Sequence, residues 1–226
     1  MQAQVSEYDQ RLLDITRELC QRLGISNYNP FFVSWETVYS GKRGQVEFPV
    51  DECLLERNCV TLSAKMKNVL EADDWRPILA SSLIFSKKFR TRIFGAIVSS
   101  FTLLLLLAIV LFAGLQILLP QSYTAMTRSG VSVTNPIGYY IAIPLDLGLV
   151  PLGTVIVALV YAKRLRVLAD RKAADIVSAT VFIATLQKIM DSKVQSGDRR
   201  GIFGRFVFVP LLPSLHARIS RLRSYS

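Results

Sequence analysis

An uncharged run from Ile93 to Leu119 constrains this chain more than any other feature of its sequence. Its polar interruptions are Ser99, Ser100, Thr102 and Gln116. At about 1.5 Å of rise per residue, a helix of this length comfortably crosses a hydrocarbon core of about 30 Å. A water-soluble domain of this size cannot easily hide so long an apolar helix, so the run predicts a membrane-spanning helix over residues 93–119.

A second apolar run, residues 137–162, predicts a return crossing. Only Asp146 is charged in it, and Pro144 and Pro151 interrupt it, so we expect a kinked span. The connection at 120–136 carries Arg128 as its one charge, and loops poor in positive charge belong on the far side of a membrane. The prediction is a two-pass hairpin that leaves both termini in one compartment, which we expect to be the cytosol. The expected location is an endomembrane, with the endoplasmic reticulum as the first choice.

Charge is distributed unevenly around these runs. The net charge of +10 conceals a balance of −4 before Arg76, five basic and no acidic residues over 76–92, and +9 from Lys163 onward. Such flanks suit anionic lipid headgroups. Nucleic acid is disfavoured as a partner because aromatic residues are not interleaved with the basic ones. The candidate headgroup contacts are Lys87, Lys88, Arg90, Arg92, Lys163, Arg164, Arg166, Arg199, Arg200 and Arg205.

The N-terminal segment, residues 1–24, predicts an amphipathic helix. Apolar residues recur at spacings of three and four, and Gly24 is a good stop signal. This seam is formed by Val5, Tyr8, Leu12, Ile15 and Leu19. It is expected either to pack on its own domain or to dock a partner protein.

Residues 25–92 predict an α+β segment. The apolar stretch Phe31–Tyr39, the turn SGKRG and the strand Val46–Val50 suggest a β-hairpin, with Pro49 placing the second strand at an edge or at its end. Short helices are predicted at Glu52–Arg57, capped by Asp51, and from Ala64 to about Ala72, capped by Ser63.

The basic C-terminal segment, residues 163–226, begins with a helix that continues the second apolar run. Ile176–Leu186 is too short to cross a bilayer and suits a buried or interfacial helix, or a strand. Ile202–Leu215 is either a strand that pairs with the N-terminal hairpin or a segment lying on the bilayer. The predicted fold class is therefore an α+β membrane protein: a two-helix transmembrane hairpin with a cytosolic head formed by both ends of the chain.

No set of residues typical of catalysis, cofactor binding or metal binding emerges. His216 is the one histidine, which excludes multi-histidine metal sites and disfavours a Ser-His-Asp triad. The three cysteines, Cys20, Cys53 and Cys59, form no CxxC pair and suggest reduced thiols. Asp146 is the charged residue inside an apolar run; it either caps a shortened helix or pairs with Arg128 or a partner subunit.

The stretch WRPILASSLIFSKKFRTRIFGAIV from Trp75 to Val98, the hairpin after it and the helix around ADRKAADIVSATVFIATL resemble the transmembrane protein 268 family. The resemblance covers about Val46 to Leu186 and includes the order of a short strand and two helices before the membrane. This chain differs in its longer far-side connection and its compact C-terminal end. The resemblance implies a membrane adaptor role, and it implies no reaction.

Three functions follow from these patterns. The first is a non-enzymatic accessory subunit or adaptor that docks a larger membrane-protein partner through its cytosolic faces. The second is direct binding or shaping of a bilayer that contains anionic lipids, through the basic flanks and the C-terminal segment. The third, an enzyme or a transporter, would require a role for Asp146.

Overall fold

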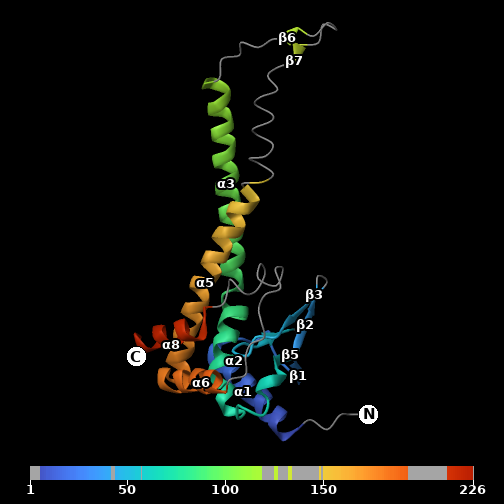
Figure 1. The fold of residues 1–226 in the computed structure, drawn as a ribbon, viewed down its shortest axis with the longest axis vertical. Helices are drawn as coiled ribbons and strands as arrows, with labels where there is room; N and C mark the ends of the chain where they lie inside the picture. The colour runs from blue at the N-terminus through green and yellow to red at the C-terminus, as the bar shows by residue number, and fades with distance from the viewer. Residues whose placement is uncertain are drawn as a thin grey trace. The chain divides into compact units, whose positions relative to one another are not determined.

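The structure of this chain, a computed structural model, describes residues 6–41, 44–56, 58–118, 125–126, 132–133, 148, 150–192 and 213–225. The fold is α+β, mostly helical with a small sheet, which confirms the α+β part of the predicted class (Figure 1). The chain divides into two compact units. We call Met1–Arg90 together with Ala162–Ser226 the head domain, and Thr91–Tyr161 the insertion. Both ends of the chain therefore build the head domain.

Helix α1, Glu7–Leu23, matches the predicted N-terminal helix. It ends at Gly24, whose φ of 67° is the left-handed conformation that glycine adopts without a steric cost. The backbone N–H of Gly24 donates to the carbonyl of Gln21 at 3.1 Å and closes the last turn. The apolar face of α1 is buried inside the head domain, where the helix packs on α2 (Arg76–Leu83) and on the strand β1.

The main sheet has the strand order β1-β5-β4. Strand β1, Phe32–Glu36, pairs in parallel with β5, Cys59–Ser63, and β4, Leu54–Leu55, pairs with the other edge of β5 in antiparallel fashion. Every residue of β5 is buried. A central strand buried on both faces has no polar side to alternate with, which explains why β5 lacks the usual strand pattern in the sequence.

The predicted β-hairpin is confirmed as an antiparallel pair of strands, and the prediction is wrong in the extent of both strands. Strands β2, Val38–Gly41, and β3, Gly44–Glu47, pair in antiparallel fashion around the SGKRG turn. The preceding residues Phe32–Glu36 form the separate strand β1, because they pair with the distant strand β5. β3 ends at Glu47, two residues before Pro49.

Two predicted short helices are wrong. Where Glu52–Arg57 was expected to be helical, Leu54–Leu55 forms strand β4, because pairing with β5 supplies backbone hydrogen bonds that local propensity cannot anticipate. Arg57 lies outside the described residues. The helix expected from Ala64 to about Ala72 is only the 3₁₀ turn η1, Ala64–Met66, and the side chain of Ser63 does not cap it.

A nearly continuous helical path leads from the head domain into the insertion. The 3₁₀ turn η2, Asp73–Trp75, is followed by α2, by the π-helix η3, Ile84–Lys88, and, after Phe89, by α3, Arg90–Leu118. Seven residues of α2, from Pro77 to Leu83, are buried, and the side chain of Trp75 is fully buried. Helix α2 is thus a central element of the head domain, in contact with α1, β4 and α6.

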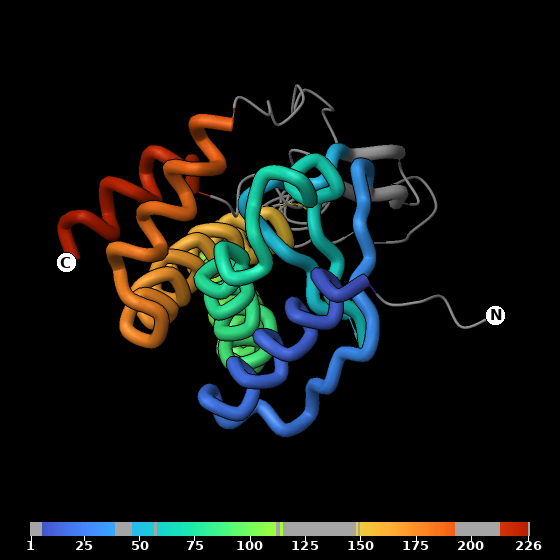
Figure 2. Tube along the Cα trace, turned by 90° about the horizontal axis from the view of Figure 1, so that it is seen from below, coloured from blue at the N-terminus to red at the C-terminus, as the bar shows by residue number. Residues whose placement is uncertain are grey.

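The head domain is completed by helices from the C-terminal part of the chain. Helix α5, Val150–Val177, enters it at Ala162, and α6, Ala179–Asp191, and α8, Leu215–Arg223, lie side by side (Figure 2). The predicted basic helix after Lys163 is confirmed, since α5 runs through this position without a break. Ile176–Leu186 is helical rather than extended, with a break at Ser178, where φ is 91°.

The insertion contains most of α3, the first part of α5 and the short antiparallel pair β6, Ala125–Met126, and β7, Ser132–Val133. Within the described residues one helix is long and apolar enough to cross a membrane, and the candidate span is Arg90–Leu111. This agrees with the first predicted span. Of the second, 137–162, only residue 148 and the helical part from Val150 onward are described, so a second crossing is not confirmed.

Inside the insertion, α3 and α5 approach each other closely at Gly153. A Cβ atom added to Gly153 would lie 3.1 Å from Cδ1 of Leu104, so the two helices approach closely at this glycine. Ala108 and Thr154 are buried, and the hydroxyl of Thr154 donates to the carbonyl of Val150 at 2.8 Å. Most large apolar side chains of α3 remain exposed.

Candidate functional site: a buried ionic network

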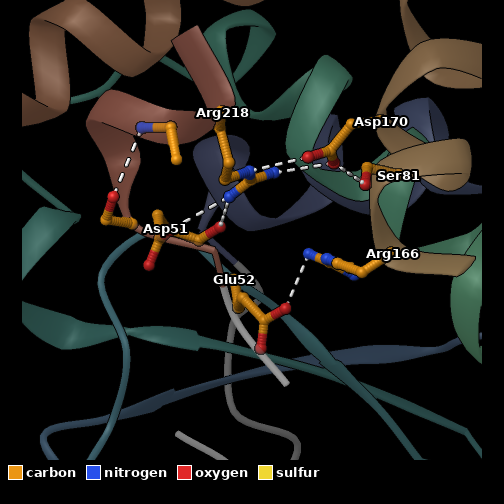
Figure 3. A network of polar contacts seen from close by, with 8 residues as sticks. Asp51, Glu52, Ser81, Arg166, Asp170 and Arg218 are labelled. Carbon is orange, nitrogen blue, oxygen red and sulfur yellow. Dashed lines mark hydrogen bonds and ion pairs between the residues drawn. The ribbon is translucent and has the colours of Figure 1, made fainter. Parts of the chain in front are cut away.

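Five ionisable side chains converge inside the head domain (Figure 3). Asp51 and Glu52 follow strand β3, Arg166 and Asp170 are one turn apart on α5, and Arg218 lies on α8. Helix α8 begins at Ser214, whose hydroxyl accepts a hydrogen bond from the backbone N–H of Ala217. The helix then buries one face, and Arg218 is part of that face.

Arg218 forms the centre of the network. Its Nε and Nη2 atoms donate to Oδ2 and Oδ1 of Asp170 at 2.8 and 2.9 Å, a bidentate pairing. Its Nη1 atom donates to Oδ2 and to the backbone carbonyl of Asp51 at 3.0 and 3.1 Å. The Ser81 hydroxyl donates to Oδ1 of Asp170 at 2.5 Å, and the ring of Phe182 lies 5.5 Å from the guanidinium carbon. The Arg218 side chain is fully buried.

A second ion pair lies beside the first. Nη2 of Arg166 is 2.7 Å from Oε1 of Glu52, and the Arg166 side chain is only 2% exposed. The ring of Phe85, on η3, lies 5.3 Å from the Arg166 guanidinium carbon. The 2.7 Å contact lacks the alignment of a hydrogen bond, so Nη2 and Nε of Arg166 have no hydrogen-bond partner among the described residues. The same holds for Oδ1 of Asp51.

Burial and pairing act on the pKa values in opposite directions. Burial raises the pKa of the Glu52 carboxyl more than Arg166 lowers it. At Asp170, burial favours a higher pKa, but the charges of Arg218 and Arg166 and the hydrogen bonds to this carboxylate outweigh it, so its pKa is lowered. Burial opposes the charge of Arg218, yet Asp170 and Asp51 together raise its pKa. Arg218 and Asp170 are therefore charged at neutral pH.

The network suits a structural role better than ligand binding. A cavity of about 10 Å³ beside Asp170 and Arg218 has room for about one water molecule. Four of the N–H donors of Arg218 are already engaged by protein acceptors. No group of three or more His, Cys, Asp or Glu residues that could hold a metal ion occurs in the described part of the chain.

The predicted docking seam is not a free surface. Leu12, Ile15 and Leu19 are at most 1% exposed and pack within the head domain, so they cannot serve as partner contacts. The Tyr8 hydroxyl donates to the carbonyl of Leu70 at 2.6 Å and accepts from Nε1 of Trp75 at 3.1 Å. Val5 lies outside the described residues. The seam therefore packs within its own domain, which was the first of the two expectations for it.

The predicted headgroup contacts differ in their exposure to solvent. Arg166 is wrong as a headgroup contact, because it is buried against Glu52. Lys87 is half-buried, with its Nζ 4.3 Å from the centre of the Tyr28 ring, and burial together with the nearby Arg90 lowers its pKa. The exposed members are Lys88, Arg90, Arg92, Lys163 and Arg164. Arg199, Arg200 and Arg205 lie outside the described residues.

The other residues singled out in the sequence contribute little to a site. Asp146 and Arg128 lie outside the described residues, and His216 is exposed on α8. All three cysteines are free and buried. Burial raises the pKa of the Cys53 thiol to about 12 and that of the Cys20 thiol to about 11, so both are protonated and unreactive at neutral pH.

Sequence reasoning missed the network itself. Asp170 and Arg218 were counted only as members of a basic tail, and Asp51 was expected to cap a helix. A signal was present around Asp170, because Ala169, Ala173 and Ala174 form a small apolar face that a carboxylate interrupts. A charged residue on an otherwise apolar helix face indicates one of two things. Either this face is not the buried one, or the charge is paired with a buried group of opposite charge.

Comparison with models of protein families found no match, and neither did comparisons with characterised proteins and with solved structures. The resemblance to the transmembrane protein 268 family remains a prediction from the sequence.

Proposed function

We propose that this chain is a non-enzymatic accessory subunit or adaptor of a larger endomembrane complex, anchored by a two-pass hairpin. The proposed hairpin rests on the Arg218 network. This network joins Asp51 and Ser81, which precede the insertion in the sequence, to Asp170 and Arg218, which follow it. Since both ends of the insertion belong to one compact domain, a chain that crosses the bilayer along α3 has to cross back.

The exposure of α3 supports a membrane setting. The apolar 18-residue window of the candidate span Arg90–Leu111 has a mean hydropathy of 2.6, and only 6% of this window is buried. Its exposed large apolar side chains include Phe94, Phe101, Leu103, Leu106, Leu107 and Val110. Water would penalise such a surface, whereas lipid would not. The basic residues at both ends of the insertion favour the cytosol for the head domain, and the endoplasmic reticulum is the proposed membrane.

An exposed aromatic pair supports a docking role for the head domain. Phe31 and Phe32 are 60% and 45% exposed at the start of β1, and their ring centroids are 5.2 Å apart. Aromatic residues are enriched in the cores of protein interfaces, and exposing two adjacent rings is otherwise unfavourable. We therefore propose Phe31 and Phe32 as contacts for a larger membrane-protein partner. The adaptor role implied by the family resemblance agrees with this proposal.

Co-purification tests the adaptor function. Tagged full-length protein, extracted in mild detergent, is expected to elute from a size-exclusion column with a stoichiometric larger partner. The variant Phe31→Ser/Phe32→Ser should lose that partner, while Val181→Ser, a change at a 45% exposed residue of α6, should keep it. Elution of the wild type as a lone monomer from native membranes would refute the adaptor function; retention by the double variant would refute only this surface.

Binding of anionic lipid is the second candidate, favoured by Lys88, Arg90, Lys163 and Arg164. These exposed residues lie within a few positions of the two ends of the insertion, where basic side chains attract anionic headgroups. Full-length protein exchanged into micelles that contain equal amounts of phosphatidylserine and phosphatidylcholine should retain the anionic lipid preferentially. The variant Lys163→Ala/Arg164→Ala should weaken this preference, and equal retention of both lipids by the wild type would refute the function.

A further inference from the structure

The charges of the buried network are divided between the two segments of the head domain. The segment before the insertion supplies two carboxylates, Asp51 and Glu52. Both guanidinium groups of the network, those of Arg166 and Arg218, come from the segment after it. Neither segment can pair these charges in the observed way without the other.

The buried carboxylates of the first segment therefore depend on the second segment for their cations. The Asp51 side chain is 2% exposed in the complete domain, and that of Glu52 is 18% exposed. Burying a charged carboxylate without a cation is strongly unfavourable, because the group loses its hydration and gains nothing in return. The head domain can close around these carboxylates only when Arg166 and Arg218 arrive on the same side of the membrane.

We propose that closure of the head domain locks the return crossing, with the Glu52–Arg166 and Asp51–Arg218 ion pairs as the lock. The inference rests on the proposed hairpin. The Glu52–Arg166 and Asp51–Arg218 pairs form only when both segments share one compartment, so they add their free energy to that topology alone. A chain with its C-terminus on the opposite side forfeits both pairs and leaves Asp51 and Glu52 without their cations.

Two leucine variants separate the lock from the charge bias of the flank. Arg166→Leu and Arg164→Leu each remove one positive charge from the same turn of α5, so they change the positive-inside bias equally. Arg166 is buried against Glu52, whereas Arg164 is exposed. The full-length chain, synthesised into microsomes with a glycosylation acceptor appended to its C-terminus, reports the fraction of C-termini in the lumen.

The wild type and Arg164→Leu should leave all but a small fraction of the C-terminal acceptors unmodified. Arg166→Leu should raise the glycosylated fraction at least about tenfold, because breaking a buried ion pair shifts the equilibrium by more than one decade. The exchange Glu52→Arg/Arg166→Glu restores an ion pair and should lower the fraction again.

Each of the remaining outcomes would refute either the lock or the hairpin. If Arg166→Leu unfolds the head domain, seen as sensitivity to added protease, while the C-terminus stays outside, the lock is refuted. Equal glycosylation of Arg166→Leu and Arg164→Leu also refutes the lock and leaves the hairpin standing. A wild-type chain with a fully glycosylated C-terminus and a protease-accessible N-terminus refutes the hairpin itself.

Discussion

Arg218 and Asp170 form a bidentate ion pair between α8 and α5, with Nε–Oδ2 and Nη2–Oδ1 distances of 2.8 and 2.9 Å. The pair joins the C-terminal helix to the helix that returns from the insertion. Because Nη1 of Arg218 also donates to Asp51, this one side chain connects three parts of the sequence that lie far apart. The head domain is therefore held together at its polar centre as well as by its apolar core.

Removing Arg218 should be among the most damaging single changes. Arg218→Ala leaves Asp170 and Asp51 buried without their cation, which costs about 3 to 5 kcal/mol for a buried pair. Arg221→Ala, an exposed residue one turn later on α8, should change stability by less than about 0.5 kcal/mol. Both tryptophans, Trp35 and Trp75, belong to the head domain, so their fluorescence follows its unfolding by urea in detergent. Equal midpoints for the two variants would contradict this role.

Acid should weaken the head domain through Asp170. Its pKa in the folded state lies below its ordinary value of about 3.9, so the folded domain holds its carboxylate unprotonated where the unfolded chain already binds a proton. The stability that Asp170 contributes is present above about pH 4 and is lost as the pH falls through the folded-state pKa. Unfolding midpoints of the wild type should fall over this range, and Asp170→Asn should remove part of that dependence. An unchanged pH profile in Asp170→Asn would contradict the pairing.

The buried seam of α1 predicts a large effect of truncation in the core. Leu12 is fully buried, and Leu12→Ala should destabilise the head domain by about 2 to 5 kcal/mol, through lost apolar burial and the cavity left behind. Gln21→Ala, on an exposed position of the same helix, should be close to neutral. Urea unfolding of both variants measures the difference. If Leu12→Ala left the stability of the head domain unchanged, the seam would not be part of the core and would again be a candidate partner surface.

The sequence predicted those features that local patterns determine. The helix that ends at Gly24, the long apolar helix and the antiparallel pairing of the strands on either side of SGKRG each depend on a short stretch of the chain, and each lies close to its predicted position. The pairing of β1 with β5 depends on residues about 27 positions apart, and no local propensity encodes it. The burial of Arg166 likewise could not be predicted from its neighbours in the sequence. Its neighbours Lys163 and Arg164 are exposed, and only the position of Glu52 in the fold makes it a core residue.

The break between α5 and α6 predicts a stabilising substitution. Ser178 has φ 91° and ψ 134°, a conformation that costs a residue with a Cβ atom about 1 to 3 kcal/mol. Its backbone still donates to the carbonyl of Ala174 at 2.8 Å and accepts from the N–H of Phe182 at 3.1 Å, so α6 remains attached to the turn and keeps Phe182 over Arg218. Glycine adopts this conformation freely, at an entropic cost of about 0.5 to 1 kcal/mol.

Ser178→Gly should therefore raise the unfolding midpoint, by about 1 kcal/mol of added stability after the entropic cost is subtracted. Ser178→Ala removes the same hydroxyl, which contacts Thr180 at 2.7 Å, but keeps the Cβ atom and should gain nothing. The comparison isolates the backbone, because both variants lose the exposed hydrogen bond. If alanine stabilised the domain as much as glycine, the hydroxyl rather than the backbone conformation would be the source of the strain.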